Sequence, residues 1–193
     1  MHSDNELKLL SIKAYENACE LLEDAKILFS AKRFSRAYVL AHLATEELAK
    51  LPIIYGTRVR LNGNENIDWK KFKFRLSNHQ AKLRSIALFD YMNDDVDLIK
   101  NQDVERYNRQ LEFVKSFDLI KNLGLYSGYH ENTPYKPSEQ FLEENAESMI
   151  NLTKGRILAL NKKWAGMVGG NIGPSNFSIY KIIQEALKNV EQS

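Results

Sequence analysis

The spacing of apolar residues constrains this sequence most, because they recur every three to four positions along each long segment. A period of 3.6 places them on one side of an α-helix, whereas a half-buried β-strand needs strict alternation. No segment sustains such alternation. The sequence therefore predicts an all-α protein. In the first segment, residues 6–30, the apolar residues with this spacing are Leu7, Leu10, Ala14, Leu21, Ala25 and Leu28.

Capping and helix-breaking residues divide the chain into about five long helices. Ser35 can cap a second helix, which Pro52 kinks or ends. A third helix is expected after the N-cap Asp68, and a fourth is expected to end at Gly124. Ser138 can cap a fifth. Helices joined by short connections favour an antiparallel bundle.

The length of 193 residues is typical of one domain. We expect residues 1–165 to form the helical bundle. Residues 166–193 are expected to form a glycine-rich connection and an amphipathic C-terminal helix, as part of the same domain or of a dimer interface. The connecting segment between residues 126 and 137 has two prolines and several aromatic residues, so we expect an ordered loop there.

Composition narrows the class of function. The formal net charge is only +2, which argues against a protein that coats polyanions, so any contact with nucleic acid must be local. Cys19 is the single cysteine, and the four histidines lack the close spacing of metal ligands. We therefore expect no disulfide, metal or cofactor. No segment has the roughly 18 apolar residues of a membrane span, so we expect a cytoplasmic protein with no membrane partner.

Two adjacent glutamates in the second helix are candidates for binding. Glu47 lies among leucines on a largely apolar side, where an unpaired charge would be costly, so it needs a partner. Glu46 belongs to a different stripe, with His42 four residues before it and Lys50 four residues after it. That spacing indicates an ion-pair ladder on the surface. Structural pairing and site chemistry are both open for Glu47.

His79 is the candidate proton acceptor. It lies on the apolar stripe of the third helix, with Arg75 and Lys82 on the same side. Two cations beside an imidazole disfavour its protonation and leave it ready to accept a proton near neutral pH. A hydrogen-bonded histidine in the core is the other interpretation.

The end of the fourth helix brings together Lys121, Asn122 and Tyr126. A helix C-terminus favours cations electrostatically, which is a sufficient structural reason for the lysine. The loop continues with aromatic residues and His130, which can stack on or hydrogen-bond an unpaired base. Such a loop can also bind a partner protein.

These motifs resemble the AbiV family of abortive-infection proteins, which are of the HEPN type. The double-glutamate helix is the most specific piece of the resemblance. The match covers roughly residues 12–160 in the right order. The segments that carry it are FSRAY (34–38), LATEELAK (43–50), WKKF (69–72), HQAK (79–82), and KNLGLY (121–126) followed by Pro137.

The resemblance implies a bundle of four to five helices that dimerises, and a role in arresting phage-infected cells. Many HEPN proteins are metal-independent endoribonucleases whose signature is an arginine, a polar residue and then a histidine. At the equivalent helix end this chain has Lys121, Asn122 and Tyr126. Because a tyrosine is a poor general base at neutral pH, His79 or His130 would have to supply the imidazole.

The leading hypothesis is a block of translation through RNA cleavage, by attack of a 2′-hydroxyl on the adjacent phosphorus. His79 would transfer the proton, while Lys82 and Lys121 would stabilise phosphate charge. Asn122 or Tyr126 would position the nucleotide. The candidate substrate-binding residues are Glu46, Glu47, Lys50, Arg75 and His130.

Two other classes of function remain. One is a non-catalytic HEPN-like dimer that binds a phage product or the translation machinery through the aromatic loop and the last helix. The other is a small-molecule enzyme that uses a buried Glu47. The expected partners are a second copy of the chain, a phage-encoded activator protein and RNA.

Overall fold

The structure is a computed structural model that describes residues 2–94, 104–173 and 176. It is almost entirely helical, which confirms the predicted all-α class. The elements are α1 (Asp4–Ser30), α2 (Phe34–Leu48), α3 (Lys50–Asn62), α4 (Trp69–Ser77), α5 (His79–Asp94), α7 (Val104–Leu125), β1 (Gly128–His130), β2 (Thr133–Tyr135), α8 (Pro137–Gln140), α9 (Glu143–Lys163) and the short 3₁₀ helix η1 (Ala165–Met167).

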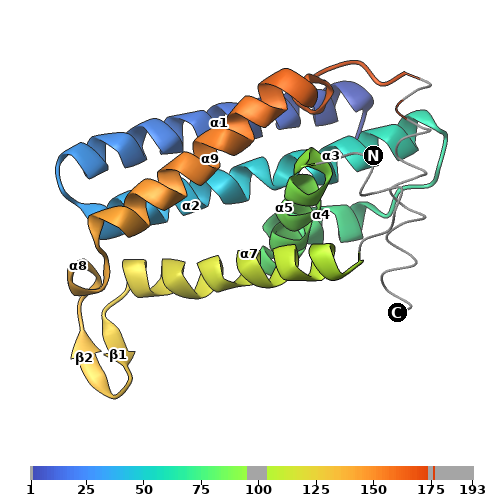
Figure 1. Cartoon of the computed structure of the whole chain (residues 1–193). Helices are drawn as coiled ribbons and strands as arrows, with labels where there is room; N and C mark the ends of the chain where they lie inside the picture. Colours follow the sequence, from blue (N-terminus) through green and yellow to red (C-terminus); the bar gives the residue numbers. More distant parts are fainter. Residues whose placement is uncertain (1, 95–103, 174–175, 177–193) are drawn as a thin grey trace.

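Helix α2 is the centre of the bundle and packs against α1, α9, α7 and α5 (Figure 1). Its small residues Ala37, Ala41 and Ala44 are completely buried and let α1 approach closely. A side of small residues can also pack against a second copy of a chain, which is one reason to expect a dimer. The fold uses it inside one chain, so it does not support dimerisation.

The predicted boundaries at Asp68 and before Pro52 are confirmed, but Ser35 and Ser138 are not N-caps, because α2 already begins at Phe34 and Ser138 lies inside the short helix α8. The Asp68 side chain accepts a hydrogen bond from the Lys71 backbone N–H at 2.9 Å and begins α4. Pro52 lies in the first turn of α3, where its missing N–H costs no helical hydrogen bond. Helix α2 accordingly ends at Leu48 and α3 begins at Lys50, although Ala49 between them keeps a helical conformation (φ −62°, ψ −18°).

The expected third helix is in fact two. Asn78 has an extended conformation (φ −78°, ψ 122°), and its backbone N–H donates to the Phe74 carbonyl to end α4. Its side-chain oxygen accepts the Ala81 N–H at 2.9 Å and so begins α5. One asparagine thus separates the two helices and makes His79 the first residue of α5.

A small β-hairpin follows α7, where the sequence indicated a loop and no strands. Glu131 and Asn132 both have positive φ (50° and 62°), which suits the two-residue turn that pairs His130 with Thr133. The hairpin projects from one end of the bundle (Figure 1). It was missed because three-residue strands are too short to show alternation.

Gly124 is not the helix cap that the sequence indicated. It lies inside the last turn of α7, which runs to Leu125, and it is buried. A Cβ atom there would lie 2.8 Å from the Phe141 ring and 3.0 Å from Val39. Glycine is therefore required by the close approach of these two side chains.

The C-terminal segment packs on the bundle as far as the structure describes it. The Gly170 carbonyl accepts a hydrogen bond from the buried Arg58 guanidinium at 2.9 Å, and the Asn176 side chain donates to the Tyr55 hydroxyl at 2.6 Å. The amphipathic helix expected after residue 176 lies outside the described residues. Among the described helices, none is long and apolar enough to span a membrane.

Candidate functional site

Glu46 is buried, so the predicted surface ladder is wrong. Only 5% of the residue is exposed, on the side of α2 that faces α5 and α7. The spacing of His42 and Glu46 correctly predicted their contact, but a spacing of four does not tell which side of a helix packs inward. This carboxylate organises the candidate site.

Four side chains from three helices surround the Glu46 carboxylate. From α5, the Lys82 ammonium lies 2.5 Å from Oε2, and the His79 Nδ1 lies 3.1 Å from the carboxylate. From α7, the Lys121 ammonium lies 2.9 Å from Oε1. One turn earlier in α2, the His42 Nε2 lies 3.4 Å from Oε1. We call these five residues the Glu46 cluster.

The Glu46 cluster keeps its carboxylate ionised. Burial alone would raise the pKa of Glu46, but hydrogen bonds from His42, Lys82 and Lys121 outweigh it and hold that pKa well below its usual range. In the described contacts one carboxylate faces two ammonium groups, so the negative charge of Glu46 is compensated inside the bundle.

His79 forms the open side of the Glu46 cluster. The predicted place on a core stripe is wrong, because the break at Asn78 turns the ring outward and leaves 54% of its side chain exposed. Glu46 holds Nδ1, while Nε2 has no hydrogen-bond partner among the described residues. His79 is thus an oriented imidazole with one nitrogen available to a ligand.

Lys82 and Lys121 are both buried, and their ammonium groups bind Glu46. The structure brings these two residues together with His79, as the hypothesis requires, although they lie 36 and 75 residues from Glu46 in the sequence. Their described contacts neutralise a carboxylate and do not place them on the surface. A role as counter-ions explains their burial.

His42 was not among the candidate site residues, and the structure places it in the Glu46 cluster. It is 1% exposed, and its ring stacks on Tyr38 with 6.4 Å between centroids. The signal that could have found it is its spacing of four from both Tyr38 and Glu46.

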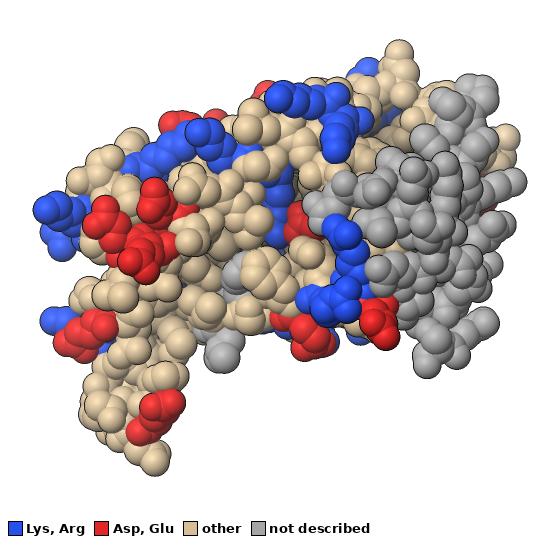
Figure 2. All heavy atoms as spheres, viewed as in Figure 1, with Lys and Arg blue, Asp and Glu red and all other residues tan. Residues whose placement is uncertain are grey.

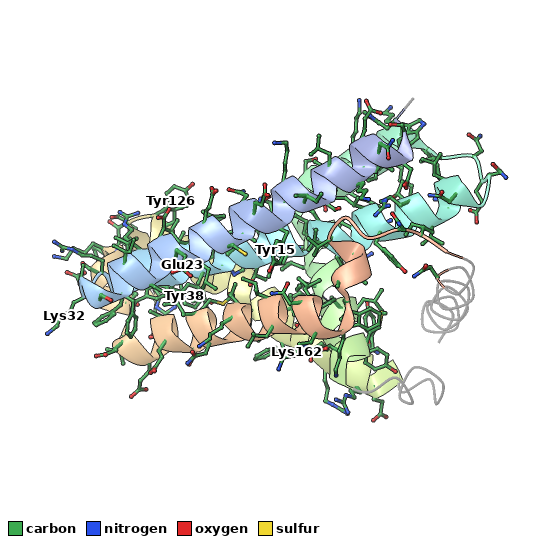
Figure 3. The ribbon with its side chains drawn as sticks, turned by 90° about the horizontal axis from the view of Figure 1, so that it is seen from above. Tyr15, Glu23, Lys32, Tyr38, Tyr126 and Lys162 are labelled. Atoms are coloured by element: carbon green, nitrogen blue, oxygen red, sulfur yellow. The ribbon has the colours of Figure 1, made fainter. Side chains whose placement is uncertain are left out.

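The remaining candidates lie apart from the Glu46 cluster in their described contacts. Glu47 has the partner that its apolar surroundings required, because the Lys50 ammonium lies 2.5 Å from its Oε1. Asn122 and Tyr126 are exposed near the end of α7, and Figure 3 draws Tyr126 towards the end of the bundle that also holds Lys32. His130 is exposed on the hairpin.

Arg75 is exposed on α4, four residues before His79 and across the break at Asn78. The two residues therefore belong to different helices and do not share one helical side. The expectation that Arg75 disfavours protonation of His79 assumed one continuous helix, so this geometry no longer supports it.

A second buried ion pair lies next to the Glu46 cluster. The Arg156 guanidinium of α9 donates to both oxygens of Asp90 at 3.0 and 2.5 Å and to the Thr45 hydroxyl at 3.1 Å. Gln110 of α7 donates to the same carboxylate at 3.2 Å. These contacts connect α2, α5, α7 and α9 and fix the helices that carry the Glu46 cluster.

The described residues contain no group of three or more histidine, cysteine, aspartate or glutamate side chains arranged to hold a metal ion. The Glu46 cluster places an oriented imidazole beside two buried ammonium groups. Such an arrangement can transfer protons.

A helical bundle with charged side chains gathered between its central helices is consistent with the HEPN class. The family model HEPN_AbiV, described as AbiV, matches residues 6–157, which include the whole Glu46 cluster. The chain belongs to this family, which associates it with abortive infection, a form of phage defence. Neither the curated proteins nor the solved structures give a match to this chain.

Proposed function

We propose that this protein arrests phage-infected cells by blocking translation through RNA cleavage, with His79 transferring the proton in a metal-independent site. The observation that carries the proposal is the contact between the His79 Nδ1 and the Glu46 carboxylate at 3.1 Å. A carboxylate accepts a hydrogen bond from Nδ1–H and so favours the imidazole tautomer with a lone pair on Nε2. That nitrogen belongs to a half-exposed ring and can reach a substrate.

The proposed reaction needs few groups. His79 Nε2 removes the proton from a 2′-hydroxyl, whose oxygen attacks the adjacent phosphorus. The bond from phosphorus to the 5′-oxygen breaks, and that oxygen takes a proton from the imidazolium or from water. The products are a 2′,3′-cyclic phosphate and a 5′-hydroxyl. Lys82 and Lys121 act by keeping Glu46 ionised, with no direct phosphate contact.

The N-terminus of α5 supports binding of a phosphate beside His79. The backbone N–H groups of His79 and Gln80 find no acceptor among the described residues. Free N–H groups at a helix N-terminus favour anions, and so does the positive end of the helix dipole. Asn122, Tyr126 and His130 remain proposed contacts to the rest of the nucleotide chain.

A homodimer belongs to the proposal, because the family's sites are expected at a cleft between two copies. Sedimentation at micromolar concentration tests it. A strict monomer would leave the Glu46 cluster to act alone within one chain.

The test of cleavage is incubation of the purified protein with total cellular RNA in EDTA, with and without extract of infected cells. We expect discrete fragments that end in 2′,3′-cyclic phosphates. The His79→Gln variant should give none, whereas Gln80→Ala, an exposed neighbour, should cut like the wild type. Intact RNA under all these conditions contradicts the proposal.

A non-catalytic binding protein is the second candidate, and the hairpin favours it. Tyr126 and Tyr129 are 62% and 77% exposed at the end of the bundle, and the hairpin around them is largely uncharged in Figure 2. Exposed aromatic residues of this kind are typical of protein interfaces. Inhibited translation with intact RNA in the same experiment would favour this function.

A further inference from the structure

Helix α4 has an unusual surface directly before His79 in the chain. Its nine residues include four cations and no acid, and Lys70, Lys71, Lys73 and Arg75 are all exposed. The three lysines form no ion pair within the part of the chain that the structure describes. The carboxylate of Asp68 is occupied with the Lys71 backbone N–H.

One aromatic side chain stands in the middle of these cations. Phe74 is 60% exposed, although a phenylalanine would normally be buried. It lies four residues after Lys70 and three after Lys71, so both lysines neighbour it on the outer side of the helix. A flat apolar ring flanked by cations can stack on a base while the cations bind the phosphates on either side.

The inner side of α4 holds the helix firmly in place. Phe72 is buried, and Trp69 and Leu76 pack with it against Leu7, Ile53 and Ile54 of α1 and α3. Because these apolar residues are used in the core, α4 cannot turn them towards a lipid surface. Phe74 is the large apolar side chain of α4 that stays exposed. One such ring can stack on one base, but it is too small an apolar surface for insertion into a membrane.

We propose that α4 is the docking surface for single-stranded RNA and guides the strand to His79. The inference rests on the proposed function for the identity of the reacting group, but the binding that it predicts is separate from cleavage. His79 lies five positions after Phe74 in the chain, which limits their Cα atoms to about 18 Å apart. A strand stacked on Phe74 therefore needs only a few nucleotides to reach the imidazole.

The test measures binding of a fluorescent single-stranded RNA whose 2′-hydroxyls are methylated. This RNA cannot be cleaved by the proposed reaction, because a methylated 2′-oxygen cannot attack the adjacent phosphorus. The first variant combines Lys70→Gln, Lys71→Gln and Lys73→Gln. It should lose most of the affinity, and the slope of log affinity against log salt should become about 2 smaller, since each phosphate contact to a single strand contributes about 0.7.

The matched control combines Lys13→Gln, Lys154→Gln and Lys162→Gln, which removes the same charge from exposed positions of α1 and α9. It should bind nearly as the wild type does. Phe74→Ala should bind about 5- to 100-fold more weakly, the range of a lost base stack, whereas Phe74→Trp should retain affinity. All these positions are exposed, so the variants should fold.

Equal affinity of the two triple variants overturns the inference, because net charge alone would then explain binding. Binding to anionic lipid vesicles with no binding to RNA also overturns it. If RNA is bound through α4 but never cleaved, the inference holds and the proposed function fails. If RNA is cleaved and the α4 variants cut at the wild-type rate with unchanged affinity, the proposed function holds and the inference fails.

Discussion

Two carboxylates, the buried Glu46 and the partly buried Asp90, are neutralised in different ways. Asp90 is held by the planar guanidinium of Arg156, which donates to both of its oxygens. Glu46 is held by two separate ammonium groups and lies in contact with two imidazoles. Bidentate geometry suits a fixed structural pair, because one arginine satisfies the whole carboxylate.

The two sites differ in whether a hydrogen-bonding group is left without a partner among the described residues. Around Asp90, each nitrogen of the Arg156 guanidinium donates a hydrogen bond, and Gln110 donates a further one to the carboxylate. Around Glu46, His79 still has an Nε2 without a partner among the described residues and a half-exposed ring. A buried charge therefore says little about function. A partly exposed group that the buried charge orients is the better indicator.

The largest effect should come from Glu46→Gln, which leaves two buried ammonium groups beside a neutral amide. We expect the free energy of unfolding to fall by about 4 kcal/mol, as for other buried pairs that lose one partner. Urea unfolding at neutral pH measures it. Adding Lys82→Met should restore part of the loss, because one uncompensated charge is removed. A loss under about 1 kcal/mol would show that the Glu46 cluster is not a buried electrostatic unit.

Arg156→Met should be nearly as destabilising, at about 3 kcal/mol, since it leaves the Asp90 carboxylate without its cation. Phage protection per folded molecule should nevertheless stay at the wild-type level, because Arg156 does not contact Glu46. Thermal melts and plating assays of the same variant test this. Lys154→Met, exposed on the same helix, is the control. If fully folded Arg156→Met protein loses protection, Asp90 and Glu46 are both needed for function, and the proposed difference between them is wrong.

Acid should reduce the contribution of Glu46 to stability. Since the pKa of Glu46 is lower in the folded chain than its ordinary 4.5, this stability is present above about pH 4.5 and is lost as pH falls below that value. The stability gap between the wild type and Glu46→Gln should therefore narrow by at most about 2 kcal/mol between pH 5 and pH 3. A gap that stays constant over this range contradicts the lowered pKa.

The smallest effect on stability and the largest on function should come from His79→Gln. Because the ring is half-exposed, the free energy of unfolding should change by no more than about 0.5 kcal/mol. Phage protection should nevertheless be abolished, since glutamine cannot transfer the proton. Full protection by the stable variant would remove His79 from the proposed site and favour the binding function.

The sequence predicted the elements whose causes are local. Asp68 and Pro52 act on their own helices, so the start of α4 and the break before α3 follow from neighbouring residues. The burial of Glu46 could not be predicted in this way, because it depends on how α5 and α7 pack against α2. Lys82 and Lys121 were predicted as cations that stabilise phosphate charge, and their pairing with Glu46 was not predicted, because spacing alone does not connect residues so far apart in the chain.

Asn78 also determines which kinds of sequence change the protein can accept. It is the whole connection between α4 and α5, with its backbone ending one helix and its side chain starting the next. One inserted or deleted residue here would change the direction in which α5 leaves α4, because no second connecting residue can absorb the difference. Either the docked side of α4 or the pair of His79 and Lys82 would then face the wrong way. A substitution such as Asn78→Ala should cost only the cap of α5, about 1 kcal/mol, whereas a change in chain length alters how the two helices are placed.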